Sequence, residues 1–137
     1  MFELFDHTAD LGLRLRADSF EALFQEAGRG LLAMIVANPE AVRTVQSKTI
    51  EIAGDDPPYL LFDWLNELLY AFESEKLLLA EFEIAFSGKQ LIAICRGEPM
   101  DHERHEMDHE VKAITYHGLS VTQEESGTWI AEVIVDI

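Results

Sequence analysis

Two strand-like runs separated by a polar connection open the chain, in the sequence Phe2-Glu3-Leu4-Phe5-Asp6-His7-Thr8-Ala9-Asp10-Leu11-Gly12-Leu13-Arg14-Leu15-Arg16-Ala17. In the second run, leucine or alanine alternates with glycine or arginine, which is the period of a strand with one buried face. We therefore expect strands at residues 2–6 and 11–17. Their connection holds Asp6, His7 and Asp10. Side chains of this kind can serve a plain turn, but two carboxylates and an imidazole within five residues also make it a candidate site.

Helical periodicity follows these strands. After an N-cap at Asp18, apolar residues recur at helical spacing as far as Ile35, and Asn38-Pro39 ends the helix. A second helix is expected after the turn at residues 54–58, with an apolar stripe over residues 61–72. Further strands are predicted at residues 42–52, 79–86, 90–96, 111–117, 119–123 and 128–136. The pattern indicates an α+β fold, in which one domain over residues 1–137 packs two helices against a largely antiparallel sheet.

The charge balance restricts the choice of partners. The 137 residues include 26 acidic and 10 basic side chains, for a formal net charge of -16. Such a surface repels nucleic-acid phosphates, so direct nucleic-acid binding is not expected. It suits cations or the basic face of a protein partner, although acidity also serves solubility alone. No apolar run approaches the ~20 residues that cross a bilayer. With a lone cysteine, Cys95, and no basic, apolar leader, a cytoplasmic location is expected.

The other end of the sequence offers companions for Asp10. The chain closes with Val135-Asp136-Ile137, an apolar strand that ends in a side-chain carboxylate beside the terminal one. If the last strand lies beside the first ones, Asp136 and the carboxylate of Ile137 come close to Asp10. Clustered carboxylates repel one another unless a cation compensates them, and calcium or magnesium prefers such oxygen ligands. His7 would suit a softer metal, or would simply hydrogen-bond to the turn.

Three histidines, His102, His105 and His109, lie within residues 101–110. Their spacings of three and four would align them on a helix, as in some zinc sites. The run lacks the His-Glu-x-x-His order of a zinc helix, however, and a solvated loop is the favoured interpretation. His105 is the member of the three most worth testing.

Lys112 is a cation in a strongly acidic chain. On a strand it would reach a site at the sheet edge, or it would only form a salt bridge with one of the many carboxylates. Cys95 has no neighbouring base in the sequence and is expected in the core. The chain lacks a glycine-rich phosphate loop, a Gly-x-Ser-x-Gly elbow and a cysteine pair. The usual enzyme signatures are therefore missing.

Three motifs together resemble one family. They are Asp6-His7-Thr8-Ala9-Asp10, Glu110-Val111-Lys112-Ala113-Ile114-Thr115-Tyr116-His117 and the closing Val135-Asp136-Ile137. Their order and spacing over nearly the whole chain resemble those of archease. The resemblance implies a small protein of strand-helix-strand-strand type that is not itself an enzyme. It implies a cofactor of an RtcB-type RNA ligase that promotes guanylylation of the ligase and repeated turnover in tRNA splicing or RNA repair.

The resemblance also implies roles for particular residues. The family's metal ligands fall on Asp10, Asp136 and the terminal Ile137, and its functional lysine falls on Lys112. Calcium is the preferred ion, with magnesium or manganese as alternatives. Two other functions remain open: a chaperone-like modulator of a tRNA methyltransferase, and a metal-dependent phosphoester hydrolase that uses the same carboxylates. The oligomeric state and the role of the histidine-rich loop are not indicated.

Overall fold

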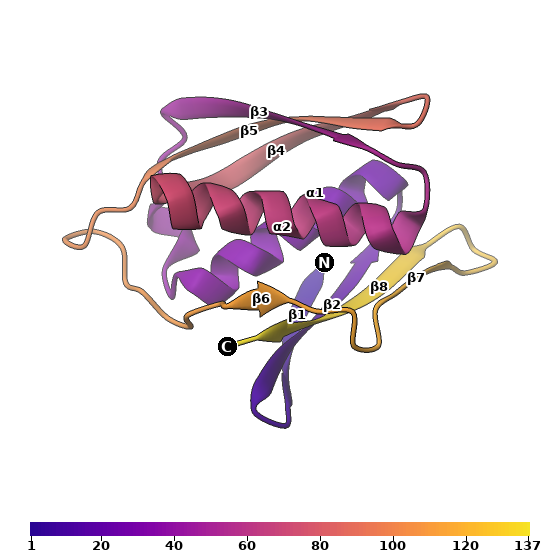
Figure 1. The fold of residues 1–137 in the computed structure, drawn as a ribbon, viewed down its shortest axis with the longest axis horizontal. Coiled ribbons are helices and arrows are strands. Elements are labelled where there is room, and N and C mark those ends of the chain that lie inside the picture. The colour runs from indigo at the N-terminus through magenta and orange to yellow at the C-terminus, as the bar shows by residue number, and fades with distance from the viewer.

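The computed structural model describes residues 1–137 and arranges the chain in three layers, with helices α1 and α2 between two sheets (Figure 1). The elements are β1 (Phe2–His7), β2 (Asp10–Ala17), α1 (Phe20–Ile35), a 3-10 turn (Pro39–Ala41), β3 (Gln46–Ala53), α2 (Pro57–Glu75), β4 (Leu77–Ser87), β5 (Gln90–Pro99), β6 (Ala113–Ile114), β7 (Ser120–Gln123) and β8 (Trp129–Asp136). The predicted fold class, two helices packed with antiparallel strands, is confirmed.

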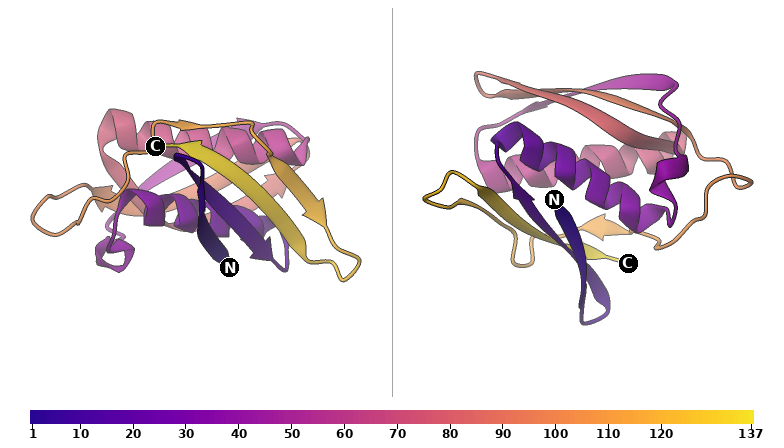
Figure 2. Two further views of the ribbon diagram at one scale, coloured as in Figure 1. Left: turned by 90° about the horizontal axis from the view of Figure 1, so that it is seen from below. Right: turned by 180° about the vertical axis from the view of Figure 1, so that it is seen from behind.

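The strands divide into two sheets. The five-stranded sheet has the order β1-β2-β8-β6, with β7 also paired to β8, and the three-stranded sheet has the order β3-β5-β4. Every strand pair in both sheets is antiparallel. The last strand therefore lies beside β2, and the C-terminal end of β8 comes next to the β1–β2 hairpin (Figure 2). This neighbour relation brings the turn of the first hairpin close to the C-terminus.

The β1–β2 hairpin is tighter than predicted, because both strands extend into the polar connection. His7 pairs with Asp10, so only Thr8 and Ala9 remain as the turn, and Ala9 takes a left-handed φ of 67°. Behind the turn, the ring of Phe5 covers Gly12 so closely that a Cβ atom there would lie 2.2 Å from the ring. A larger residue at this position would force the Phe5 ring to move, because the ring occupies the place of a side chain.

Helix α1 is the centre of the core. Its N-cap is Ser19 rather than the predicted Asp18, because the Ser19 hydroxyl accepts the Ala22 N–H at 3.1 Å. The buried face of α1 includes Phe24, whose carbonyl accepts the indole N–H of Trp64 on α2 at 2.9 Å. The two helices are thereby joined by a buried hydrogen bond as well as by apolar contact.

Two predicted strands are shorter than the sequence pattern indicated. Strand β3 begins at Gln46 instead of residue 42, and the run predicted at 111–117 contributes only Ala113 and Ile114 to the sheet. Beyond these, the Thr115 hydroxyl donates to the Ile134 carbonyl at 2.8 Å and accepts the His117 N–H at 3.2 Å. The Thr115 N–H also donates to the Ile134 carbonyl at 3.0 Å, and beyond this residue the chain leaves the sheet.

None of the helices has both the length and the apolar character needed to span a lipid bilayer.

Candidate functional site

Asp10 and Asp136 oppose each other on neighbouring strands. They are directly paired residues of β2 and β8, and Asp136 is in turn paired with Ala113 of β6. Directly opposed residues share one face of a sheet with Cβ atoms about 4.5–5.5 Å apart. The next residues along, Leu11 and Val135, are buried against the helices, so the two carboxylates lie on the outer face. The predicted meeting of these two aspartates is what the strand register provides.

The electrostatics of this pair are uncompensated. Asp136 is exposed and forms no ion pair, and the side chain of Asp10 is 27% exposed. The one ion-pair partner of Asp10 is His7, whose Nδ1 lies 3.8 Å from the Asp10 Oδ2, too far for a hydrogen bond. Asp6 faces the opposite side of the hairpin, since it pairs with the core-facing Leu11. Neither His7 nor Asp6 therefore holds the Asp10 carboxylate through a side-chain hydrogen bond.

The donor set fits a hard cation at an open site. Two opposed carboxylates supply anionic oxygens, and Ile137 follows Asp136 directly in the sequence. No group of three or more histidine, cysteine, aspartate or glutamate side chains is gathered to hold a metal anywhere in the chain. Calcium takes about six to eight oxygen ligands. An ion between Asp10 and Asp136 would therefore need further oxygens from water, from the C-terminal carboxylate of Ile137 or from a partner.

Lys112 lies next to this pair along the backbone. Its N–H donates to the Asp136 carbonyl at 2.7 Å, which fixes it at the end of β8. The side chain is exposed and takes part in none of the ion pairs of the chain. The expected alternative, a salt bridge with a nearby carboxylate, is therefore absent. The Lys112 ammonium remains free to meet an anion brought by another molecule.

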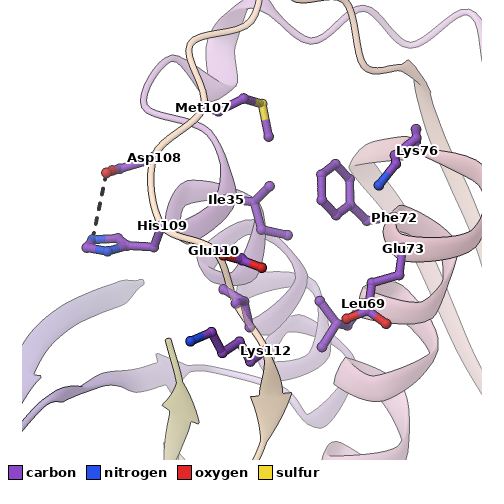
Figure 3. Close-up of a pocket in the computed structure, with 11 residues that line it drawn as sticks. Ile35, Leu69, Phe72, Glu73, Lys76, Met107, Asp108, His109, Glu110 and Lys112 are labelled. Atoms are coloured by element: carbon purple, nitrogen blue, oxygen red, sulfur yellow. Dashed lines mark ion pairs between the residues drawn. The ribbon is translucent and has the colours of Figure 1, made fainter.

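An open pocket of about 410 Å³ adjoins Lys112 (Figure 3). Its apolar floor is formed by Ile35, Leu69 and Phe72, and its rim carries charged side chains of both signs. Figure 3 shows the Lys112 side chain directed away from Leu69 and from Glu73 on α2. The pocket therefore lies between the C-terminal ends of α1 and α2 and the segment 107–112.

The histidine-rich segment is not one solvated loop. His105 is only 3% exposed, whereas His102 is exposed and His109 is half-buried. The segment is not helical, so the spacing of the three histidines does not align them. They form no metal cluster. The prediction of a solvated loop is correct for His102 and wrong for His105, because the His105 side chain is buried against Glu98 of β5.

Those partners form a buried polar cluster around Glu98, at the end of β5. One Glu98 oxygen lies 3.0 Å from the His105 Nε2 and accepts the Arg43 N–H at 2.7 Å, and the other pairs with the Arg104 guanidinium. The Asp101 N–H donates to the His105 Nδ1 at 2.9 Å. Since a backbone N–H can only donate, the Nδ1 carries the lone pair, and the proton on Nε2 is directed at Glu98.

This cluster fixes the loop to the body of the fold. The Arg104 guanidinium beside Glu98 is the main cause that lowers the pKa of the Glu98 carboxyl to about 2, with help from the Arg43 N–H and from His105. Asn38 adds two bonds to the same loop, donating to the Arg104 carbonyl at 2.9 Å and accepting the Glu106 N–H at 2.8 Å. The only signal of this cluster in the sequence is a glutamate at the end of an apolar strand.

Comparison with known proteins identifies the relatives of this chain. Residues 2–137 match the model of the Archease protein family. The archease of Methanopyrus kandleri is 38% identical over 140 residues, covering 99% of each chain. The archease of Pyrococcus abyssi is 36% identical and covers 99% of this chain and 98% of its own.

Two solved structures have a fold similar to that of this chain. The solution structure of Methanobacterium thermoautotrophicum protein 1598 is similar with a TM-score of 0.86 and 32% identity, covering 99% of this chain and 98% of that one. The crystal structure of an archease described as a possible chaperone, from Thermotoga maritima, has a TM-score of 0.71 at 22% identity and covers 100% and 98%.

Proposed function

Because this chain belongs to the archease family, we propose that it is a protein cofactor that activates an RtcB-type RNA ligase in tRNA splicing or RNA repair, and not a catalyst itself. In this role it promotes guanylylation of the ligase and repeated turnover. The observation that carries the proposal is the direct pairing of Asp10 with Asp136 at the end of the five-stranded sheet. The chain works on its partner in the cytoplasm.

The carboxylate edge, defined as Asp10, Asp136 and the terminal Ile137, is the metal-binding part of the proposal. Asp10 and Asp136 would hold calcium, or magnesium or manganese in its place, together with the carboxylate of Ile137. Their exposure supports a site shared with a partner, because an ion held there keeps coordination positions open to groups outside the chain. The bound ion would supply positive charge that offsets the negative charge of a nucleotide phosphate.

The residues of the chain position this edge and bring it to the ligase. A net charge of -16 speeds encounter with a basic cleft. The Phe5 ring packed on Gly12 and the backbone bond from Lys112 to Asp136 hold the ends of β2 and β8 in place. Lys112, free of any intramolecular ion pair, is available to contact a phosphate. The chain thus orients charged groups around the ligase nucleotide site and needs no acid-base step of its own.

A ligation assay under multiple-turnover conditions tests the proposal. We expect Asp10→Ala and Lys112→Ala each to lose most of the stimulation that the wild-type chain gives to the ligase. Asp6→Ala is the matched control, since this carboxylate belongs to the same hairpin but faces the other side of the sheet. Undiminished stimulation by both the Asp10 and the Lys112 variants would refute the assignment.

A capture experiment separates the proposal from its main rival. We expect the tagged chain to retain an RNA ligase from the source cells. Retention of a tRNA methyltransferase instead would favour a chaperone-like modulator of that enzyme. Turnover of a phosphoester by the isolated chain would favour the hydrolase.

A further inference from the structure

All three tyrosines of the chain lie on one outer surface, and each is more than half exposed. Tyr59 is 57% exposed, Tyr70 is 65% exposed and Tyr116 is 56% exposed. Tyr59 and Tyr70 belong to α2, which Figure 1 shows on the side of the molecule that neither sheet covers. Tyr116 follows β6 and meets Tyr59 with ring centroids 5.7 Å apart. A large apolar side chain repeatedly left in water marks an interaction surface.

The tyrosines at one end of this surface are held in a fixed arrangement. The ring of Tyr116 is stacked on Phe62, with centroids 4.0 Å apart and planes 14° apart, and Tyr59 meets Tyr116 edge-on at 68°. Contacts of this kind leave the rings partly ordered before anything binds. Less conformational freedom is then lost on association, so such rings are efficient anchors for a partner.

The carboxylates between the tyrosines are unpaired. Helix α2 contains no lysine or arginine, and Tyr59, Asp63, Glu67 and Tyr70 follow one another along its exposed side at spacings of four, four and three. Neither Asp63 nor Glu67 takes part in an ion pair, whereas other exposed glutamates of the chain, such as Glu3 and Glu75, are paired within the protein. The charge of this surface is thus left for another molecule to balance.

An open pocket lies at the tyrosine-rich end. It has a volume of about 460 Å³ and is lined by Tyr59, Tyr116, Asp56, Pro58 and Leu119. Asp56 occupies the N-cap position of α2, yet its side chain makes no capping hydrogen bond and no ion pair. A guanidinium group would stack on a tyrosine ring and pair with this carboxylate, whereas a phosphate would be repelled.

We propose that the tyrosine–carboxylate face, defined as Tyr59, Asp63, Glu67, Tyr70 and Tyr116, docks an arginine-bearing basic surface of a protein partner. The inference rests on the proposed function in one respect, since it takes that partner to be the RNA ligase. The face then extends the contact with the ligase beyond the carboxylate edge, since Glu67 and Tyr70 line an open pocket together with Lys112. Self-association through this face is disfavoured, because a symmetric dimer would set its carboxylates against one another.

Affinity of the ligase for the full-length chain tests the proposal, measured by calorimetry at low and moderate salt. We expect Asp63→Lys with Glu67→Lys to weaken binding about tenfold or more, since arginine and lysine would then face added cations. Tyr59→Ala with Tyr70→Ala is expected to weaken it about tenfold through lost anchor contacts. All four side chains are exposed, so circular dichroism should show an unchanged fold.

A matched control distinguishes the effect of this face from the effect of the net charge of the chain. Glu51→Lys with Glu81→Lys makes the same change in net charge on the exposed side of the three-stranded sheet, where both glutamates are unpaired. We expect its affinity to stay within about twofold of the wild type at moderate salt. An equal loss of affinity in the control would overturn the proposal, because binding would then depend on net charge alone.

The stimulation assay distinguishes failure of this inference from failure of the proposed function. If the wild-type chain stimulates ligation while both double variants bind the ligase as tightly as it does, the docking face is refuted and the proposed function is kept. If the wild-type chain neither binds nor stimulates the ligase, both are refuted. If both double variants lose affinity for the ligase while the Asp10→Ala variant still binds it, the docking face is supported.

Discussion

The carboxylate of Glu98 and the carboxylates of Asp10 and Asp136 lie in opposite environments. Glu98 is 5% exposed and accepts bonds from Arg43, Arg104 and His105. Asp10 and Asp136 face each other at the sheet edge without a basic side chain that hydrogen-bonds to either. A buried carboxylate with all its partners serves the fold. Opposed carboxylates without partners lower the stability of the fold. Such an unfavourable pair is typical of residues kept for a function other than folding.

The largest effect on stability is expected from removing the buried carboxylate. Glu98→Ala leaves Arg104, His105 and the Arg43 N–H without their acceptor, so we expect the free energy of unfolding to fall by about 2–4 kcal/mol. Urea denaturation measures this loss. Glu98→Gln, which keeps the shape and one acceptor oxygen, should lose less. A loss below about 0.5 kcal/mol for both variants would show that the cluster does not hold the loop.

A pH dependence follows from the lowered pKa of Glu98. The carboxyl has a pKa of about 2 in the folded chain, against 4.5 as its ordinary value. Its contribution to stability is therefore complete above pH 4.5 and is lost as the pH falls from 4.5 toward 2. The stability difference between the wild type and Glu98→Gln should shrink over that range in urea titrations. A difference that stays constant from pH 7 down to pH 3 would contradict this account.

A smaller change, of opposite sign, is expected at the sheet edge. Without calcium, Asp136→Asn should raise the free energy of unfolding by about 0.5 kcal/mol, because it removes one of two like charges that face each other. Added calcium should raise the melting temperature of the wild type and leave that of the variant nearly unchanged. An equal response of both proteins to calcium would mean that the ion binds elsewhere.

The smallest effect is expected at the neighbouring carboxylate of the hairpin. Asp6 is exposed and lies on the other face of the sheet from Asp10. We expect Asp6→Asn to change the free energy of unfolding by less than about 0.5 kcal/mol and to preserve the calcium response. Loss of that response in a thermal melt would show that Asp6 belongs to the site.

The sequence predicted the elements and the proximity of Asp10 to Asp136 well, because both depend on local or terminal patterns. Alternation identified β2 and β8, and a last strand next to the first hairpin set Asp10 opposite Asp136. The division into two sheets was not predicted, since a period of two gives the buried face of a strand and not its neighbour. The N-cap moved by one residue because Asp18 and Ser19 are both good caps.

The buried histidine and the exposed tyrosines were missed for a common reason. Whether a polar or aromatic residue is buried depends on contacts with other elements: His105 packs against Glu98 at the end of β5, and its loop is held by Asn38, far earlier in the chain. The lack of an ion pair at Lys112 could not be predicted for the same reason. The sequence shows many carboxylates, but it does not show which of them come near the lysine. Long-range packing supplies this information, and periodicity does not.

Stimulation of multiple-turnover ligation is the measurement that tests the central claim most directly, with Asp10→Asn and Glu98→Gln compared at a temperature where both are folded. The account predicts that Asp10→Asn is at least as stable as the wild type and loses most of the stimulation, while Glu98→Gln is less stable and keeps it. Full stimulation by a folded Asp10→Asn chain would contradict the claim that the carboxylate edge is the functional part of the molecule.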